Sequence, residues 1–346
     1  MKLQRLTYAE IAEALNVSTA AVSLAVTGKS GISEKTRKKI LDFIKKHDQD
    51  ELDALENRLA SDSKRNILFI FYADSSEIYA QAHTKILKAA QEEARQHSFT
   101  LQPVYQMSRQ NPFQYIEELE KYPEVAGVLV LATELDAKTV SAYKMLRVPL
   151  LMMDSFFDEE VFIDAVELNY QTAFYEATKY AFSIGHEKIG FLTDDSHTQN
   201  LQHKLDGFWK ALREFGVQNF GDVPVIQLSN NIDNAYRKMK NSIEAPDFRM
   251  PTIFIGASDY AVLGAMKAFE EKNIAIPENV SFIGCGNIEA SQVSKPELTT
   301  IESNYSEMGK ISVRNLLSQI QSPNKICLRT QISTNLIKRK SVKDLR

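Results

Sequence analysis

Short hydroxyl side chains and one lysine gather in a stretch near the start of the chain. Ser18, Ser23, Thr27 and Lys29 lie close together there. Hydroxyl and ammonium groups donate hydrogen bonds to phosphate oxygens, and such contacts position a protein on a nucleic acid without reading its sequence. We therefore expect these side chains to contact phosphates, provided that the local structure presents them on one surface.

Two short helices joined by a tight turn, over residues 7–27, are the elements that must position these groups. Thr7 can cap the first helix while Glu10 reaches back to it, which forms a capping box. A small residue, a turn former and a β-branched core residue fall at Ala12, Asn16 and Val22. This spacing is typical of a helix-turn-helix, which places the start of its second helix in a DNA major groove. An ordinary α-hairpin packed in a core is the alternative.

A third helix is predicted directly after this unit. Ser33 can cap it, and Ile40, Leu41 and Ile44 give it an apolar face. The segments VSTAAVSLAVTG and ISEKTRKKIL together with the first helix resemble the N-terminal module of the lactose-repressor/galactose-repressor family of bacterial transcription regulators. The resemblance implies that double-stranded operator DNA is a partner of the chain.

The resemblance also implies which side chains touch base edges. The matching positions are Thr19, Ala20 and Leu24, and many family members carry Arg at the last of them. Leu24 cannot make the bidentate contact to guanine that Arg makes. We predict recognition through thymine methyl groups and DNA shape, with Ser18 and its hydroxyl neighbours on phosphates. Thr7 completes the DNA-binding residues predicted in the head.

Charge is unevenly distributed along the chain. The 346 residues carry a net charge of −4, yet residues 1–47 hold nine Lys or Arg against four Asp or Glu, an excess of five positive charges. A basic segment on an acidic body suits phosphate attraction at one end, although a normally solvated helical surface is the alternative. No run approaches the ~20 apolar residues that cross a membrane, and no apolar signal segment begins the chain. Cys285 and Cys327 are expected to be reduced, so we expect a cytoplasmic protein.

Residues 48–65 are predicted to form a hinge or linker. Leu52, Leu55 and Leu59 can make one apolar stripe on a short helix. The resemblance implies a hinge helix here, with Leu59 as the leucine that wedges into the minor groove. Several acids in this segment should weaken DNA binding, so a helical linker that pairs subunits without touching DNA is the rival interpretation.

Continuous apolar runs separated by amphipathic segments fill the rest of the chain. The runs at residues 67–72, 125–132, 149–154, 188–193, 251–257 and 280–285 are expected to be buried strands, and the segments 78–97, 169–184, 202–215 and 260–272 helices. This alternation predicts parallel sheets covered on both faces, in two α/β subdomains with a ligand cleft at the carboxyl ends of the strands.

The resemblance continues through blocks such as GHEKIGFLT and PTIFIGASDYAVLGAMKAF. It implies an α/β fold in which an all-α helix-turn-helix head precedes a periplasmic-binding-protein-like core of two doubly wound subdomains. The chain is expected to cross between the subdomains near residues 160, 288 and 324. The expected domains are the head at 1–47, the hinge at 48–65, one subdomain at 66–160 with 288–324, and the other at 161–287 with 325–346.

The resemblance also locates an effector site in the cleft between the subdomains. The matching residues are Asp154, Lys204, Ser258 and Asp259, with Asn287 beside Gly286, where the family carries an aspartate. Lys keeps the charge of the family's Arg but loses its planar fork, and Gly286 offers no side chain. A different sugar, a phosphorylated sugar or a non-sugar effector remain open. Ser258 and Asp259 are alternatively a helix cap.

The sequence contains no nucleophile elbow, phosphate-cradling glycine loop or clustered metal ligands, so we expect neither an enzyme nor a cofactor or metal site. The resemblance implies a repressor, dimeric or tetrameric, whose operator affinity falls when an effector shifts the two lobes. A regulator that needs a corepressor or partner protein is the first alternative, and a solute-binding protein without a DNA role is a distant one.

Overall fold

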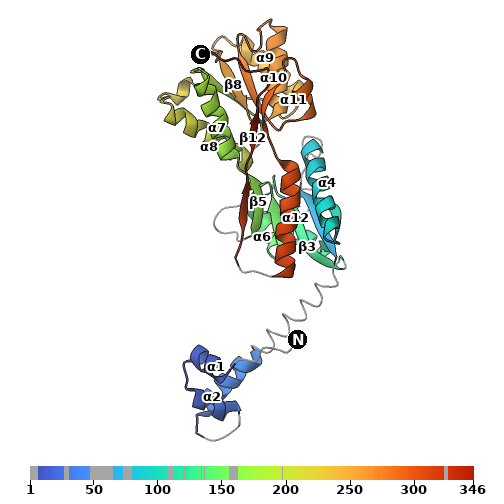
Figure 1. Cartoon of the computed structure of the whole chain (residues 1–346), viewed down its shortest axis with the longest axis vertical. Helices are drawn as coiled ribbons and strands as arrows, with labels where there is room; N and C mark the ends of the chain where they lie inside the picture. Colours follow the sequence, from blue (N-terminus) through green and yellow to red (C-terminus); the bar gives the residue numbers. More distant parts are fainter. Residues whose placement is uncertain are drawn as a thin grey trace. The chain divides into compact units, whose positions relative to one another are not determined.

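The computed structural model of the chain describes residues 7–26, 31–46, 65–72, 80–106, 112–119, 122, 124–133, 135, 137–155, 163–196, 198–322 and 326–346. The chain divides into two compact units, a head unit (Met1–Arg65) and a core unit (Asn66–Arg346). Figure 1 shows the head in blue and the core in cyan to red.

The head unit contains α1 (Tyr8–Leu15), α2 (Thr19–Val26) and a third helix over residues 34–46. The capping box predicted at the start of α1 is confirmed. The backbone N–H of Thr7 donates to Glu10 Oε2 at 2.7 Å, and the N–H of Glu10 donates to Thr7 Oγ1 at 3.3 Å. These bonds satisfy two of the free amides that begin a helix.

The turn between α1 and α2 has the expected geometry of a helix-turn-helix. Asn16 adopts the left-handed conformation with φ 51° and ψ 54°, as its residue type predicts. The N–H of Ala21 donates to Ser18 Oγ at 3.2 Å, so Ser18 caps α2. The two helices meet at 111°, within the range that helix-turn-helix units show.

Over the described ranges no single helix is long and apolar enough to span a membrane, although α1 and α2 reach that length and composition when taken together.

The head has a small apolar core. Its buried residues are Ile11, Ala12, Val22, Ala25 and Ile40. Ile40 is contributed by the third helix, which therefore holds α1 and α2 together by burial of apolar surface. Leu41, which the sequence assigned to the apolar face of this helix, is 43% exposed.

The core unit contains two six-stranded sheets with the same strand plan. The first has the order β11-β5-β4-β3-β1-β2 and the second β12-β10-β9-β8-β6-β7. The strands of the first are β1 (Asn66–Tyr72), β2 (Thr100–Gln106), β3 (Val125–Leu131), β4 (Leu150–Met153), β5 (Asp164–Leu168) and β11 (Arg329–Ile332). The strands of the second are β6 (Ile189–Thr193), β7 (Val225–Gln227), β8 (Ile253–Gly256), β9 (Ser281–Cys285), β10 (Thr299–Glu302) and β12 (Asn335–Ile337). Every pairing is parallel except that of β10 with β12.

Helices cover both faces of each sheet, as buried parallel strands require. The first lobe consists of the first sheet with α4 (Ala80–Gln96), α5 (Pro112–Leu119), α6 (Ala137–Tyr143) and α12 (Tyr305–Gln321). The second lobe consists of the second sheet with α7 (Tyr170–Ser183), α8 (Gln199–Glu214), the 3-10 turn η1 (Phe220–Asp222), α9 (Ile232–Glu244), α10 (Asp259–Glu271) and α11 (Glu289–Val293). The predicted fold class, a helical head with two doubly wound α/β subdomains, is confirmed.

The crossings between the lobes differ from their predicted positions. The strands β5 and β11 pair in the first sheet, and β10 pairs in the second. The chain therefore crosses after Leu168, after Glu302 and after Ile332, several residues beyond the expected points at 160, 288 and 324. Parallel pairing joins residues far apart in the sequence, so a strand's own residues do not say which sheet it enters.

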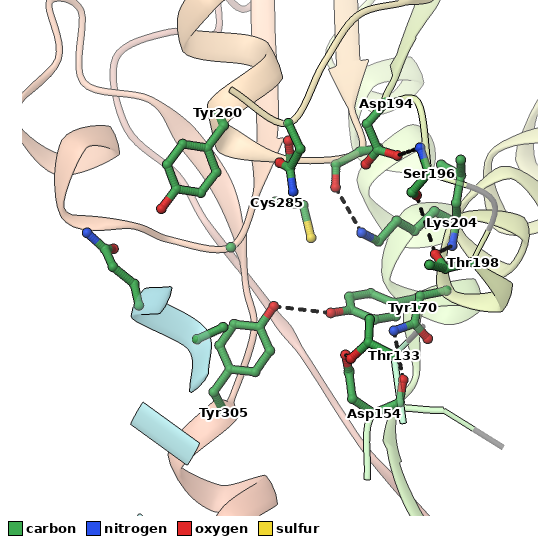
Figure 2. A pocket seen from close by; sticks show the side chains of 18 of the residues that line it. Thr133, Asp154, Tyr170, Asp194, Ser196, Thr198, Lys204, Tyr260, Cys285 and Tyr305 are labelled. Atoms are coloured by element: carbon green, nitrogen blue, oxygen red, sulfur yellow. Dashed lines mark hydrogen bonds between the residues drawn. The ribbon is translucent and has the colours of Figure 1, made fainter. Parts of the chain in front are cut away.

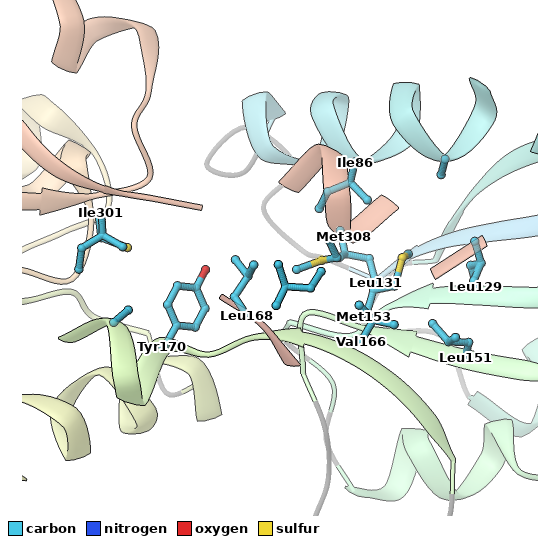
Figure 3. Packing of buried hydrophobic residues seen from close by; sticks show 14 of the residues in the cluster. Ile86, Leu129, Leu131, Leu151, Met153, Val166, Leu168, Tyr170, Ile301 and Met308 are labelled. Carbon is cyan, nitrogen blue, oxygen red and sulfur yellow. The ribbon is translucent and has the colours of Figure 1, made fainter. Parts of the chain in front are cut away.

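Apolar packing in the core continues from one lobe into the other. Leu131, Met153 and Val166 pack with Met308 in the first lobe, and the same cluster extends to Tyr170 and then Ile301 (Figure 3). This continuity follows the crossing segments, and it ties the start of α7 to the first sheet.

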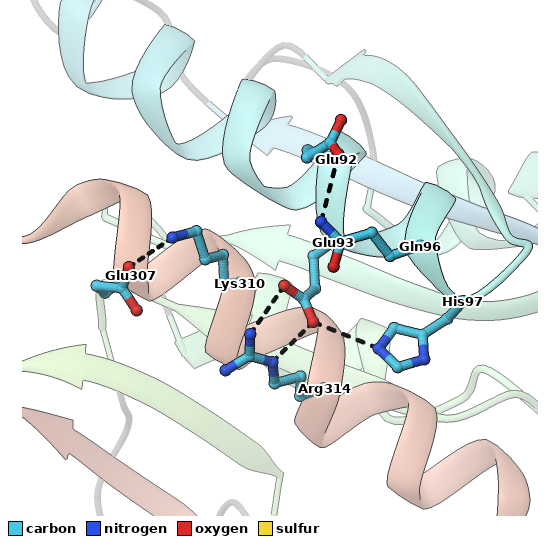
Figure 4. Close-up of polar contacts among 7 residues, drawn as sticks. All are labelled: Glu92, Glu93, Gln96, His97, Glu307, Lys310 and Arg314. Atoms are coloured by element: carbon cyan, nitrogen blue, oxygen red, sulfur yellow. Dashed lines mark hydrogen bonds and ion pairs between the residues drawn. The ribbon is translucent and has the colours of Figure 1, made fainter.

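The helices α4 and α12 pack closely on one face of the first sheet. A Cβ atom at Gly309 of α12 would lie 2.4 Å from the backbone oxygen of Ile86 in α4, so only glycine permits this approach. Arg314 Nε and Nη2 donate to the buried Glu93 carboxylate at 2.7 and 3.0 Å (Figure 4). The Arg314 side chain holds the pKa of Glu93 below its usual value. A paired buried carboxylate of this kind fixes the register of the two helices.

Candidate functional site

Strand ends from both lobes meet at one pocket. Thr133 follows β3 and Asp154 follows β4 in the first lobe, while Asp194, Ser258 and Gly286 follow strands of the second. All of them line a cavity of about 80 Å³. The carboxyl ends of parallel strands are where open α/β sheets bind ligands, so the topology itself selects this position.

Residues in or just before the first turns of five helices complete the lining. They are His83 of α4, Tyr170 of α7, Asn200 of α8, Ser258 just before α10 and Tyr305 of α12. Figure 2 shows Tyr305 and Tyr260 on one side of the space, with Lys204, Ser196 and Thr198 on the other. Because each helix follows a strand that ends here, its N-terminal end is directed toward the pocket.

Asp154 is the acidic group of the first lobe in this pocket. Asp154 is only 6% exposed, and its backbone φ of 62° is in the left-handed region, which is uncommon outside glycine. Thr133 Oγ1 donates to Asp154 Oδ2 at 2.9 Å, and Asn200 Nδ2 donates to the Asp154 backbone oxygen at 2.7 Å. The other carboxylate oxygen, Oδ1, is buried and has no hydrogen-bond partner among the described residues. Burial raises the pKa of Asp154 to about 6.

Lys204 of α8 is a cationic side chain of the pocket lining and is labelled in Figure 2. Its Nζ donates to the backbone oxygen of Ala257 at 2.9 Å and lies 4.6 Å from the centre of the Tyr170 ring. The positive charge of Lys204 opposes the effect of burial on the pKa of Asp154. The ammonium group is therefore held by the protein, on the second-lobe side of the space.

Several other groups facing the pocket are neutral near neutral pH. Burial lowers the pKa of His83 to about 4 and raises the pKa of the Cys285 thiol to about 11. The hydroxyls of Tyr170 and Tyr305 lie 3.4 Å apart, and burial raises the pKa of both. The pocket thus offers hydroxyl, amide and thiol groups beside two buried carboxylates, Asp154 and Asp194, and Asp154 Oδ1 is an acceptor without a partner among the described residues.

The structure brings three of the five predicted effector residues to the pocket. Asp154, Lys204 and Ser258 line it. Ser258 also caps α10, since its Oγ accepts from the N–H of Ala261 at 3.2 Å. The structural role considered for Ser258 is therefore present alongside its position in the lining.

Asp259 and Asn287, which were expected to contact an effector, are not part of the pocket lining. The Asp259 carboxylate is fully buried and accepts from Thr300 Oγ1 at 2.6 Å and from the N–H of Ile288 at 3.0 Å. Asn287 donates to Glu302 at 2.8 Å and accepts from Arg339 at 2.6 Å. Both side chains hydrogen-bond to groups in or near the loop after β9. The buried backbone N–H and hydroxyl donors there need acceptors, and Asp259 supplies them.

Sequence reasoning missed most of the lining. The residues not predicted include Thr133, Tyr170, Asp194, Asn200, Asn230, Tyr260, Cys285 and Tyr305. Thr133, Asp194 and Cys285 carry a usable signal, since polar or thiol groups at the ends of apolar runs point to the cleft edge. Tyr170 and Tyr305 carry none, because their helices reach the pocket only through the crossing segments.

The predicted DNA-binding side chains are distributed over the head as follows. Ser18, Thr19 and Ala20 are exposed at the start of α2, while Ser23 and Leu24 are half-buried. Thr7 is exposed and takes part in the capping box of α1. The remaining predicted contacts, Thr27, Lys29 and Leu59, fall outside the described residues.

Among the described residues, no group of three or more His, Cys, Asp or Glu side chains is arranged to hold a metal ion. Both cysteines are free thiols, with Cys285 buried and Cys327 exposed.

Comparison with known proteins covers nearly the whole chain. The family described as periplasmic binding protein-like domain matches residues 178–342. The HTH-type transcriptional repressor PurR of Photobacterium profundum is 25% identical over 98% of this chain and 99% of its own length. The repressor of the same name from Pasteurella multocida is 27% identical over 97% and 98%.

Solved structures share the fold. The lac repressor dimer bound to operator and the anti-inducer ONPF matches with a TM-score of 0.70 at 21% identity, covering 98% of this chain and 99% of that one. A LacI family transcriptional regulator from Enterococcus faecium with bound ribose matches with a TM-score of 0.69 at 21% identity, covering 81% of this chain and 100% of that one.

Proposed function

We propose that this chain is a member of the lactose-repressor/galactose-repressor family of transcriptional regulators, as its full-length similarity to the PurR repressors supports, and that it represses transcription by binding an operator under the control of a small molecule. The head, residues 1–47, binds the operator, and residues 48–65 connect it to the core. The core binds the effector between its lobes. The protein acts in the cytoplasm as a homodimer and catalyses no reaction.

One observation carries the DNA-binding part of this proposal. The helices α1 and α2 meet at 111° across a turn with Asn16 in the left-handed conformation. This geometry presents the start of α2, which major-groove readers use for base contacts. Thr19 and Ala20 are exposed there, and their methyl groups suit thymine. Ser18 is next to them and can donate to a phosphate.

The pocket supports control by a small molecule. Asp154 Oδ1 is a buried acceptor without a described partner, so a ligand that donates a hydrogen bond would satisfy it. Sugar hydroxyls are donors of this kind. A ligand that contacts Asp154 in the first lobe and Lys204 in the second favours one arrangement of the lobes over another. Such coupling is reciprocal, so operator DNA weakens effector binding by the same factor.

Recovery of genomic DNA fragments bound by the purified full-length protein tests the proposal. We expect enrichment of a near-palindromic site, and a duplex carrying that site should bind more tightly than a scrambled duplex of the same composition. A fragment pool without any enriched sequence at moderate salt would contradict the proposal. The Leu24→Arg variant should change the preferred base at one position of each half-site, because Arg supplies a bidentate contact to guanine.

The direction of control separates the main proposal from its alternative. The acids at Asp48, Asp50, Glu51, Asp53 and Glu56 favour a regulator whose operator affinity is raised by a corepressor or a partner protein. A panel of mono- and disaccharides and sugar phosphates can be screened by thermal shift of the protein. If the ligand found there lowers operator affinity, it is an inducer; if it raises operator affinity, the alternative holds.

A further inference from the structure

We propose that Arg37 is a positioning residue that orients α2, the helix that inserts into the major groove in the proposed function, and that it makes no contact with DNA itself. The inference rests on that proposed function. It adds a residue that acts through contacts inside the head. This residue lies on the third helix, which the sequence predicts to be part of a basic surface.

The recognition helix α2 has no charged side chain of its own. Its residues are TAAVSLAV, without a basic residue in its last turn. The last carbonyl groups of any helix lack partners inside the helix, and they carry the negative end of its dipole. A cation supplied from elsewhere therefore has a stabilising position at this end of α2.

Arg37 of the third helix supplies that cation. Its Nη1 donates to the backbone oxygen of Leu24 at 2.9 Å and to that of Ala25 at 3.3 Å. The Arg37 side chain is only 16% exposed, and its Nε lies 3.6 Å from the exposed Glu34 carboxylate. The guanidinium is thus turned toward the end of α2, where hydrogen bonds from a charged donor are strong.

The small apolar core makes this contact decisive for the direction of α2. Val22 and Ala25 are the buried residues of α2, and the third helix adds the buried Ile40, with Phe43 and Ile44 partly buried against the same core. Two small or branched side chains resist rotation of α2 about its axis only weakly. Arg37, three residues before Ile40 in the third helix, binds the carbonyl groups at the C-terminal end of α2. The third helix therefore contacts α2 both through its apolar side chains and through Arg37.

The neighbouring lysines of the third helix fall into two groups, those exposed to solvent and one that contacts a backbone oxygen. Lys35 and Lys38 are exposed, which is the arrangement that suits phosphate contact. Lys39 repeats the capping role on α1, since its Nζ donates to the Leu15 backbone oxygen at 3.3 Å. The basic surface predicted from the sequence therefore contains residues of two kinds, and Lys38 is a matched control for Arg37.

Full-length Arg37→Met, Arg37→Lys and Lys38→Met proteins test the proposal on the duplex recovered by the wild-type protein and on its scrambled counterpart. We expect Arg37→Met to lower affinity for the recovered site by roughly tenfold to a hundredfold, with little change for the scrambled duplex. Arg37→Lys should recover part of the loss, because an ammonium group still reaches one carbonyl. Lys38→Met should weaken both duplexes alike.

The salt dependence of binding distinguishes positioning from phosphate contact. Each phosphate contact contributes about 0.9 to the slope of log affinity against log salt. Arg37→Met should keep the wild-type slope, and Lys38→Met should reduce it by about that amount. Hydrogen exchange on the full-length Arg37→Met protein should be faster in peptides from α2, with peptides from α1 and from the core unchanged.

Four results would overturn the proposal. Three concern DNA binding, namely a salt slope that falls in Arg37→Met, equal loss on both duplexes, and unchanged binding. Faster exchange across the whole head would also overturn it, because Arg37 would then be a general fold residue. Failure of the proposed function looks different, since the wild-type protein itself would then not discriminate between the duplexes.

Discussion

The two lobes of the core share one strand plan but contribute different chemistry to the pocket. The fourth strand of the first sheet in sequence, β4, is followed by Asp154, and its counterpart β9 is followed by Gly286. Both residues have positive φ, 62° and 129° respectively. The residue that follows the matching strand thus carries a carboxylate in one lobe and no side chain in the other.

Asp259, a buried carboxylate of the second lobe that does not line the pocket, has a different role. Asp259, like Asp154, is buried, and burial raises the pKa of each to about 6. Asp259 uses both oxygens on Thr300 and Ile288, whereas Asp154 keeps one oxygen without a described partner. Equal burial and an equal direction of pKa shift therefore do not separate the two aspartates; the position of Asp154 in the pocket lining and its acceptor without a described partner do.

The largest expected effect concerns stability, at Asp259. Asp259→Ala would leave the Ile288 N–H without its acceptor and the Thr300 hydroxyl with only the longer contact to the Ile301 backbone oxygen, which should lower the free energy of unfolding by about 3 kcal/mol. Urea unfolding of the ligand-free protein measures it, with Thr300→Val as a milder control that removes one donor. If Asp259→Ala kept the wild-type free energy of unfolding but lost effector binding, Asp259 would be a binding residue and its assigned difference from Asp154 would be wrong.

The next effect concerns binding, at Asp154. Asp154→Asn would turn a charged acceptor into a neutral amide, so affinity for the ligand found by thermal shift should fall by roughly tenfold to a hundredfold. The free energy of unfolding should stay the same or rise, because a buried charge is removed. Calorimetric titration and urea unfolding give the two values.

Thr133→Val sharpens this test, since it removes only the donor to Asp154 Oδ2 and should cost less affinity than Asp154→Asn. A loss of stability in Asp154→Asn equal to that in Asp259→Ala would contradict the assignment of the two roles.

The smallest effect is a pH dependence of ligand binding. The pKa of Asp154 is raised to about 6, so the carboxylate becomes protonated as the pH falls through that value. The ionised form is the better acceptor, and affinity should therefore fall by about tenfold between about pH 7 and pH 5. The Asp154→Asn protein should bind with a flatter profile over the same interval. Equal pH profiles for the two proteins would assign the titration to another group.

Much of the head and the strand pattern followed from local residues. Thr7, Glu10 and Asn16 formed the predicted capping box and turn, because both depend on residues only a few positions apart. The apolar runs that were expected to be strands correspond to β1, β3, β4, β6, β8 and β9. Short strands such as β7 and β12 were not anticipated, since partly exposed strands lack a continuous apolar run. The helix α12 was not anticipated either.

The candidate site was harder to predict. Asp154, Lys204 and Ser258 were expected in the pocket through the family resemblance, and they line it. Asp259 and Asn287 were expected with them and instead fasten the loop after β9. The sequence placed Asp259 one residue from Ser258, and neighbouring residues at a helix start point in different directions.

The sequence by itself determined the helix caps, the left-handed turn at Asn16 and the buried strands, because each depends on side chains that are neighbours along the chain. Only the tertiary structure decided which sheet β5, β10 and β11 enter, which aspartates line the pocket, and that Arg37 donates to the backbone oxygen of Leu24 in α2. Those outcomes depend on groups brought together from distant parts of the chain. Their hydrogen bonds and burial are fixed by packing rather than by local preference.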